Sequence, residues 1–300
     1  MAVIDSAELL LRGHIYSGSG AWQDQSGNGH HGTATGATYN ATDKCFDFDT
    51  SGEEIRVPHH ADLDIADGVG VTIMIVCETS DNSIDWQYLC GKKANTGTGN
   101  AGYMYWIPTN GIPRGMVSDG TLYVGANAPS GITNDTKTVV AFRRSPHTTG
   151  DDDIQTHIDG SAGAPSTDPT TATLANAIDF MIGNGATNGE QLIGKVYDVA
   201  MWRTDLSDAD IATAGTEILQ TAVELTATIL STSTVGVSSL ALSQENAFTL
   251  IPDGDQTRDS VINEQGATSF VDHRVAGPVS VRDDRKRVLL RQRQTRRGDR

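Results

Sequence analysis

The clearest hydrophobic pattern in the chain is residues 69–77, Val-Gly-Val-Thr-Ile-Met-Ile-Val-Cys. In an extended chain its apolar side chains fall on both faces: Val71, Ile73, Ile75 and Cys77 on one, Met74 and Val76 on the other. Side chains alternate between the two faces of a strand, so this pattern predicts a central strand that is covered on both sides.

Shorter apolar or alternating stretches predict many further strands. They lie at residues 9–15, 43–57, 88–90, 103–107, 116–124, 138–142, 154–158, 180–182 and 196–202. Asp119-Gly120 divides one of them into a hairpin. One helix is predicted after residue 206, with Ser207 and Asp210 as its capping pair and an apolar stripe further on. Strands without helical crossovers predict an all-β, two-sheet antiparallel sandwich.

A polar, glycine-rich stretch at residues 22–32, Trp-Gln-Asp-Gln-Ser-Gly-Asn-Gly-His-His-Gly, predicts a tight loop. Asp24, Ser26 and Asn28 are spaced by two, as in loops that present oxygens to Ca²⁺, but Thr35 stands where such a loop would be closed by Glu. Two interpretations stay open: a partial Ca²⁺ site, or side chains that bond to the loop backbone. His30 and His31 are neighbours whose side chains should diverge, which indicates a loop feature.

Five motifs in order carry a resemblance to a known family. They are the loop at 22–32, Phe46-Asp-Phe-Asp49, Ile55-Arg-Val-Pro58, Asp62-Leu-Asp-Ile65, and Gly194–Trp202 followed by Leu206–Ile211. Together they resemble the laminin-G-like, concanavalin A-like lectin-glucanase jelly-roll family. The resemblance implies a jelly-roll domain at residues 1–222, with one short helix after the last strand. Asp49-Thr50, Val196 and Asp210 depart from the family pattern in detail.

Composition fits one sandwich core, because 37% of the 300 residues are hydrophobic and 32 are glycine. The N-terminus has no basic start, and Leu9-Leu-Leu11 is too short for a signal-peptide core. We therefore expect synthesis in a host cytoplasm without a signal peptide, and no membrane segment. Three cysteines, Cys45, Cys77 and Cys90, are expected to be buried free thiols.

Residues 223–300 have a different texture and are expected to form an extended C-terminal arm or a small β extension. The last nineteen residues carry nine Arg/Lys and three Asp, whereas residues 1–281 carry a net charge of −22. Residues predicted to contact other proteins are Arg285, Lys286, Arg287, Leu289, Leu290, Arg291 and Arg293. Nucleic acid is a less favoured partner, because the acidic body would repel it and aromatic residues are lacking.

Catalysis is not expected. Glucanases with this sandwich fold take their carboxylates from one strand, as Glu-x-Asp-x-(x)-Glu, and the chain has no such string. Glu53 and Glu54 are adjacent and would face opposite sides of a strand. The carboxylates at residues 62–67 fall on a structural segment of the resembling family, and those at 151–153 form a solvated loop cluster.

Aromatic residues near residues 86–106 indicate saccharide binding instead, because sugar sites use aromatic faces with a few polar groups. The candidates are Trp86, Tyr88, Tyr105 and Trp106. By analogy, the family resemblance, the cytoplasmic start, the free cysteines and the C-terminal segment together suggest a non-enzymatic virion structural protein of a bacteriophage. It would be of the capsid decoration or fibre type, anchored to virion proteins and to copies of itself. The alternatives are a tail or receptor-binding component, or a free-standing lectin.

Overall fold

The computed structural model describes residues 2–66, 69–84, 86–93, 100–146, 153–170, 172–185 and 190–219, and then the strands at 238–241, 249–253, 260–261, 267–270, 280–283 and 288–293. The chain divides into two compact units, Met1–Ala222 and Val223–Arg300. Within the described residues, no helix has both the length and the apolar character needed to cross a membrane.

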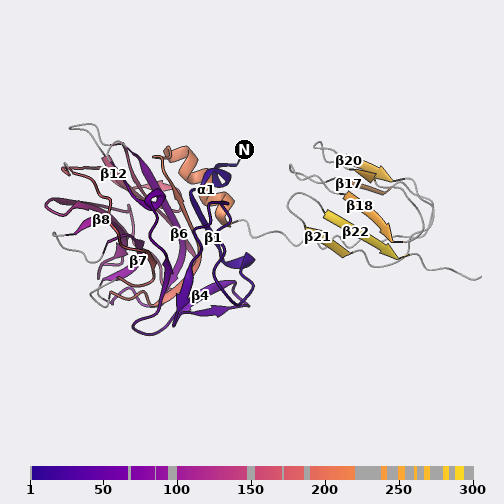
Figure 1. The fold of residues 1–300 in the computed structure, drawn as a ribbon, viewed down its shortest axis with the longest axis horizontal. Helices are drawn as coiled ribbons and strands as arrows, with labels where there is room; N and C mark the ends of the chain where they lie inside the picture. The colour runs from indigo at the N-terminus through magenta and orange to yellow at the C-terminus, as the bar shows by residue number, and fades with distance from the viewer. Residues whose placement is uncertain are drawn as a thin grey trace, which may run out of the picture. The chain divides into compact units, whose positions relative to one another are not determined.

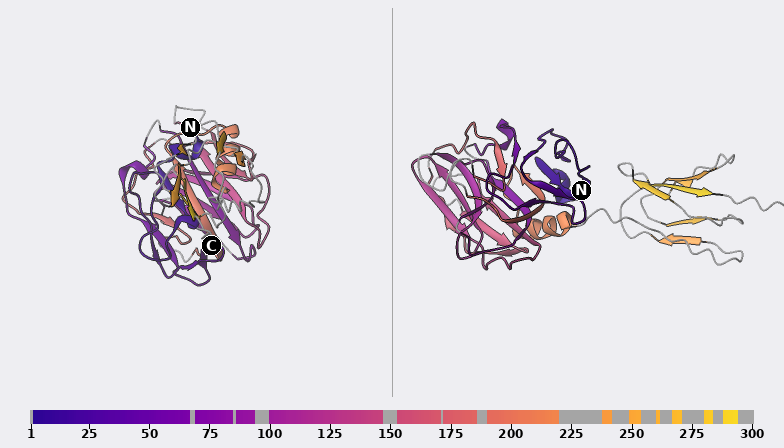
Figure 2. Two further views of the ribbon diagram at one scale, coloured as in Figure 1. Left: turned by 90° about the vertical axis from the view of Figure 1, so that its right-hand side faces the viewer. Right: turned by 90° about the horizontal axis from the view of Figure 1, so that it is seen from below.

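The first unit is a sandwich of two antiparallel sheets, as predicted (Figures 1 and 2). The nine-stranded sheet has the order β13 (Ser161–Ala162), β12 (Asp153–Ile158), β11 (Thr138–Arg144), β6 (Val71–Thr79), β16 (Gly194–Trp202), β4 (Cys45–Phe48) and β3 (Thr38–Asn40), with β1 (Leu9–Arg12) on β16 and β14 (Ser166–Thr167) on β12. The seven-stranded sheet has the order β10 (Tyr123–Asn127), β9 (Arg114–Asp119), β8 (Ala101–Ile107), β7 (Gln87–Gly91), β15 (Phe180–Ile182), β5 (Glu54–Val57) and β2 (Thr33–Thr35).

The predicted central strand is confirmed as β6, which lies between β11 and β16. Its two faces are buried in different clusters. Ile73 and Ile75 belong to the core between the sheets, while Met74 and Val76 pack under the helix. The three cysteines are buried and free, also as expected. Burial raises the pKa of Cys77 to about 12, so this thiol stays protonated at neutral pH.

The predicted helix is α1 (Asp208–Leu219), and its capping pair is confirmed. The backbone N–H of Asp210 donates to Ser207 Oγ at 3.2 Å, and Ser207 Oγ donates to an Asp210 carboxylate oxygen at 2.7 Å. Ile211, Ala214 and Ile218 face the outer side of the nine-stranded sheet. The short helix η1 (Val3–Ser6) packs beside α1, and Trp202 Nε1 donates to Val3 O at 3.1 Å. This sheet is therefore covered on both faces (Figure 1).

The outer face of the seven-stranded sheet carries a smaller cluster instead. Its members come from β7, β8, β9 and β15 and are Tyr88, Met104, Trp106, Met116 and Met181. Two further short helices, η2 (Gly13–Ile15) and η3 (Ala61–Leu63), lie in connections. The outer face of the nine-stranded sheet is thus covered by helices, whereas the outer face of the seven-stranded sheet carries this aromatic cluster.

The described residues of the second unit all lie in strands. β17 (Ser238–Ala241) pairs with β20 (Ala267–Phe270), and four more strands have the order β19 (Ser260–Val261), β18 (Thr249–Asp253), β22 (Val288–Arg293) and β21 (Ser280–Asp283). Leu289, Leu290, Arg291 and Arg293 therefore lie in an inner strand that pairs with β18 in parallel and with β21 antiparallel. Arg285, Lys286 and Arg287 lie outside the described residues.

Candidate binding site

The loop at residues 22–32 is closed by its own backbone. Trp22 and Gly32 exchange two hydrogen bonds of 2.7 and 2.9 Å, and the Trp22 side chain is buried. Inside the loop, the Asp24 carboxylate accepts four hydrogen bonds: from the N–H of Leu10 and of Ser26 at 2.9 Å, from Ser26 Oγ at 2.7 Å and from the N–H of His30 at 3.0 Å. Asp24 thus fixes the loop to β1.

The other two predicted Ca²⁺ ligands also face the backbone. Asn28 Nδ2 donates to the carbonyl oxygen of Glu8 at 2.9 Å, and Ser26 Oγ lies 2.9 Å from the same oxygen. Burial alone would raise the pKa of Asp24, but its hydrogen bonds from Ser26, Leu10 and His30 outweigh burial and lower that pKa. These contacts match the second interpretation of the loop, in which side chains bond to the backbone. Ca²⁺ binding by Asp24, Ser26 and Asn28 stays a prediction.

The structure separates the four predicted sugar-binding aromatics, and two of them need correction. Tyr105 is fully buried in the core between the sheets, where its hydroxyl lies 3.4 Å from the carbonyl oxygens of Ala141 and His157. Tyr88 is also fully buried, on the outer side of the sheet. Neither ring has a face available to a ligand from solution. Strand alternation placed Tyr105 inward, and the cluster around Tyr88 covers its ring.

Trp86 and Trp106 do come together on the outer face of the seven-stranded sheet. Their rings stack with centroids 4.2 Å apart and an angle of 13° between the planes. Trp106 is 3% exposed and forms the lower layer, whereas Trp86 is 38% exposed and forms the outer one. The backbone of Trp86 has a φ of 56°, a conformation that is strained for a non-glycine residue.

Arg114, which the sequence analysis did not single out, completes this surface. Its guanidinium carbon lies 5.9 Å from the centre of the Trp106 ring, on the neighbouring strand. The guanidinium also covers Gly125 of β10, where an added Cβ would lie 2.3 Å from Arg114 Nε. A side chain at position 125 would have to displace the guanidinium. Tyr123, 50% exposed, lies on the same strand as Gly125.

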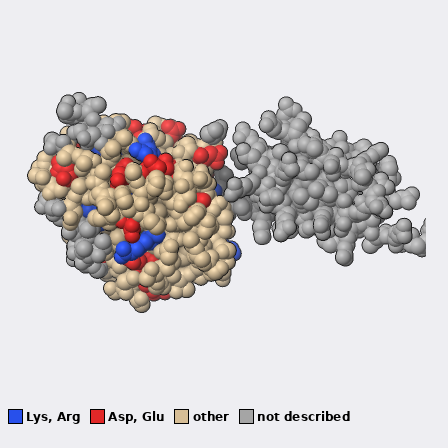
Figure 3. Space-filling view, viewed as in Figure 1, with Lys and Arg blue, Asp and Glu red and all other residues tan. Residues whose placement is uncertain are grey.

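Among the described residues, no acid neutralises the charge of Arg114. Its buried Nε has no hydrogen-bond partner, and no ion pair joins Arg114 to a carboxylate in the described part of the chain. The other arginine on this sheet, Arg56, is paired with Glu54. In Figure 3, acidic and basic side chains are scattered among a majority of uncharged ones on the face of the first unit shown. An unpaired guanidinium beside an exposed tryptophan is suited to an anionic ligand with an apolar face.

Two buried lysines, Lys92 and Lys93, follow directly after β7. Lys93 Nζ donates to the carbonyl oxygen of Asn100 at 2.6 Å, and burial lowers its pKa to about 8 although Glu190 opposes this shift. Lys92 Nζ pairs with Asp64 at 2.8 Å, and burial lowers its pKa as well. Both ammonium groups have partners within the fold, so Arg114 is the better placed cation for a ligand.

The comparison with known sequences gives no assignment. No protein-family model matches the chain, and no curated protein matches its sequence.

Solved structures do match, over about 70% of the chain. The receptor binding domain of botulinum neurotoxin D superposes with a TM-score of 0.52 at 15% identity, covering 72% of this chain and 54% of that one. The binding domain of Paraclostridial Mosquitocidal Protein 1 gives 0.56 at 11% identity, covering 72% and 53%. Trypanosoma rangeli sialidase gives 0.51 at 14% identity, covering 70% and 32%. The chain thus spans about half the length of the toxin domains and about a third of the sialidase, and at these identities the matches show a shared β-sandwich fold.

Proposed function

We propose that the first unit is a glycan-binding module that recognises a saccharide carrying a carboxylate. The observation that carries the proposal is the exposed Trp86, stacked on Trp106, beside the guanidinium of Arg114, which forms no ion pair with a described acid. An aromatic face packs against the apolar face of a sugar ring, and a guanidinium forms charge-assisted hydrogen bonds with a carboxylate. Trp86 keeps a strained backbone conformation, as residues at binding sites often do.

Two of the structural matches support this chemistry. The botulinum neurotoxin D ligand binding domain was solved in complex with N-acetylneuraminic acid, with a TM-score of 0.50 at 16% identity over 71% of this chain. The sialidase was solved with difluorosialic acid. Both ligands are acidic sugars. The support is one of fold and ligand class, because fold alone does not fix function.

The test is binding of oligosaccharides with a terminal N-acetylneuraminic acid, first on a glycan array and then by calorimetry. A hydrogen bond to a charged group contributes about 1.5–3 kcal/mol, so Arg114→Gln should weaken binding by about tenfold or more. Trp86→Ala should weaken the binding of acidic and of neutral saccharides alike. Arg56→Gln is the matched control, because Arg56 lies on the same sheet but is already paired with Glu54. Unchanged binding in both site variants, or no binding on the array, would overturn the proposal.

We also propose that the module is displayed on a bacteriophage particle and anchored through residues 223–300. The supporting observation is the charge difference between the basic last nineteen residues and the acidic remainder of the chain. Opposite charges favour attachment of the second unit to neighbouring acidic bodies, and added salt should weaken it. A tail or receptor-binding component and a free-standing lectin remain the alternatives, and no enzymatic activity is expected in any of them.

The anchor is tested by comparing the whole chain with residues 1–222, since the chain divides into units at that point. Light scattering would give the oligomeric state of both, and electron microscopy would detect particles. Self-association of the whole chain that salt reverses, and that residues 1–222 lack, supports an anchor. A whole chain that stays monomeric and joins no particle favours a free-standing lectin.

A further inference from the structure

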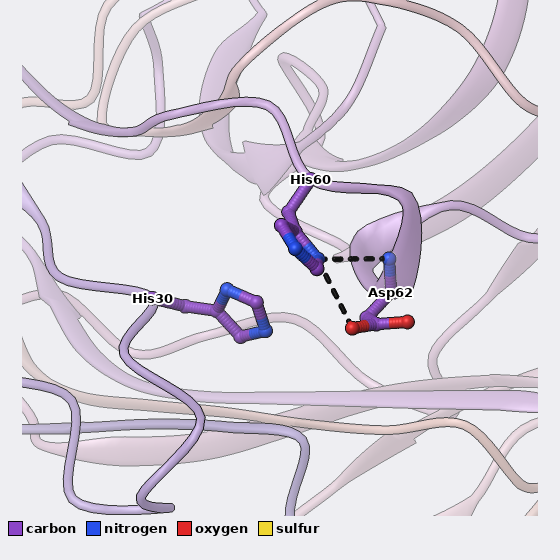
Figure 4. Close-up of side chains that lie close together, drawn as sticks. All are labelled: His30, His60 and Asp62. Carbon is purple, nitrogen blue, oxygen red and sulfur yellow. Dashed lines mark hydrogen bonds and ion pairs between the residues drawn. The ribbon is translucent and has the colours of Figure 1, made fainter.

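Three side chains that can ligate a metal meet where two connections lie side by side. His30 comes from the loop at residues 22–32, His60 is the N-cap of η3, and Asp62 lies in η3. One ligand atom of each lies within 4.8 Å of the other two, and the three side chains point toward a common space in Figure 4. The two imidazole rings are 4.8 Å apart between centroids.

His30 is held rigidly on the inner side of this space. The side chain is 5% exposed, and the backbone N–H donates to Asp24 at 3.0 Å. His30 Nε2 lies 3.1 Å from a carboxylate oxygen of Glu8, the residue before β1. A carboxylate next to an imidazole fixes the ring and increases its strength as a ligand, as is common around bound metals.

On the outer side of the space, the side chains of His60 and Asp62 lie close together. His60 Nδ1 accepts the backbone N–H of Asp62 at 3.2 Å, and the same nitrogen lies 3.0 Å from Asp62 Oδ2. This nitrogen carries either one lone pair, which accepts the N–H, or one hydrogen, which it donates to the carboxylate. A bound cation would take the Nδ1 lone pair in place of the N–H and would neutralise the carboxylate. The other oxygen, Asp62 Oδ1, is held by Arg203 at 2.9 Å.

We propose that His30, His60 and Asp62 form a binding site for Zn²⁺, with water as the fourth ligand. Two imidazoles and one carboxylate suit Zn²⁺, whereas Ca²⁺ prefers a shell made of oxygens only. Ligands of a tetrahedral Zn²⁺ lie about 2.0–2.2 Å from the ion, so the side chains must close slightly around it. His60 and Asp62 are 54% and 43% exposed and are free to do so. The ion would join the loop at residues 22–32 to η3.

The test uses the full chain after treatment with EDTA and titrates it with ZnCl₂ in a calorimeter. One equivalent should bind, and the Tm should rise with Zn²⁺ concentration, because an ion held only by the folded state stabilises it. His60→Ala and Asp62→Ala should each lower the affinity by tenfold or more. Both side chains are about half exposed, so the fold should survive and the circular dichroism spectrum should not change. Excess CaCl₂ should not displace the Zn²⁺.

His59→Ala is the matched control, since His59 is an exposed neighbour outside the cluster. Its affinity for Zn²⁺ should equal that of the unmodified chain. The proposal is overturned if the unmodified chain takes up no Zn²⁺, if His60→Ala binds as well as the unmodified chain, or if His59→Ala weakens binding as much as His60→Ala. The outcome does not depend on glycan binding, because no saccharide is present.

Discussion

Replacing Asp24 with alanine tests the hydrogen-bonded loop most directly. Four donors lose their acceptor, and two of them, the N–H groups of Leu10 and His30, belong to buried residues. The Ser26 donors can bond to water instead. A buried donor without a partner costs about 1–3 kcal/mol, so two such donors should lower the free energy of unfolding by about 4 kcal/mol. That is a large share of the about 5–15 kcal/mol that stabilises a typical domain.

Thermal unfolding is the assay. For a unit of this size, 1 kcal/mol corresponds to about 2–4 °C, so Asp24→Ala should lower the Tm by about 8–16 °C at neutral pH. Asp24→Asn keeps the shape and one acceptor oxygen and should lose about half as much. The pKa of Asp24 is lowered in the folded state, so its contribution is present above the ordinary value of 3.8 and is lost as the pH falls through the lowered value. The curves of the unmodified chain and of Asp24→Ala should therefore converge in acid.

The same experiment tests Ca²⁺ binding. If the carboxylate serves only the backbone, the loss of Tm in Asp24→Ala is equal in EDTA and in CaCl₂. If Asp24, Ser26 and Asn28 hold Ca²⁺, the unmodified chain is more stable in CaCl₂ and Asp24→Ala does not respond. A fall in Tm of less than about 2 °C under both conditions would refute the assigned role of the buried hydrogen bonds.

Two further predictions concern other parts of the first unit. Burial, with the charges of Arg12 and Lys137, lowers the pKa of His14 from 6.5 to about 4. The free energy of unfolding should therefore be at its full value above pH 6.5 and should fall toward pH 4. The expected loss is about 1–2 kcal/mol after allowance for solvent screening. Urea unfolding of His14→Asn should lack this fall, and equal acid sensitivity would contradict the assignment. Gly183→Ala should cost about 2–4 kcal/mol, because an added Cβ lies 2.1 Å from the Phe48 ring at a φ of 83°. Gly52→Ala is the control at a φ of 91° with nothing within 4 Å, and equal losses in both would show that φ alone decides.

The sequence by itself determined the class of fold. The apolar residues on both faces of β6 predicted a strand covered on both sides, because each face of a buried strand packs against other apolar residues. The capping pair Ser207 and Asp210 fixed the start of α1, since a helix needs acceptors for its first N–H groups. These features depend on neighbours in the chain, and so they can be read locally.

The surfaces with candidate functions were decided by the tertiary structure. Trp86, Tyr88, Tyr105 and Trp106 look alike in the sequence, and only strand register and a bulge in β7 separate buried rings from the exposed one. Register also places Arg114 opposite Trp106 on the next strand. The same holds for His30, which looked like half of a diverging pair with His31 and instead meets His60 and Asp62. A site built from residues far apart in the chain has no local signal, because its geometry exists only after the sheets have packed.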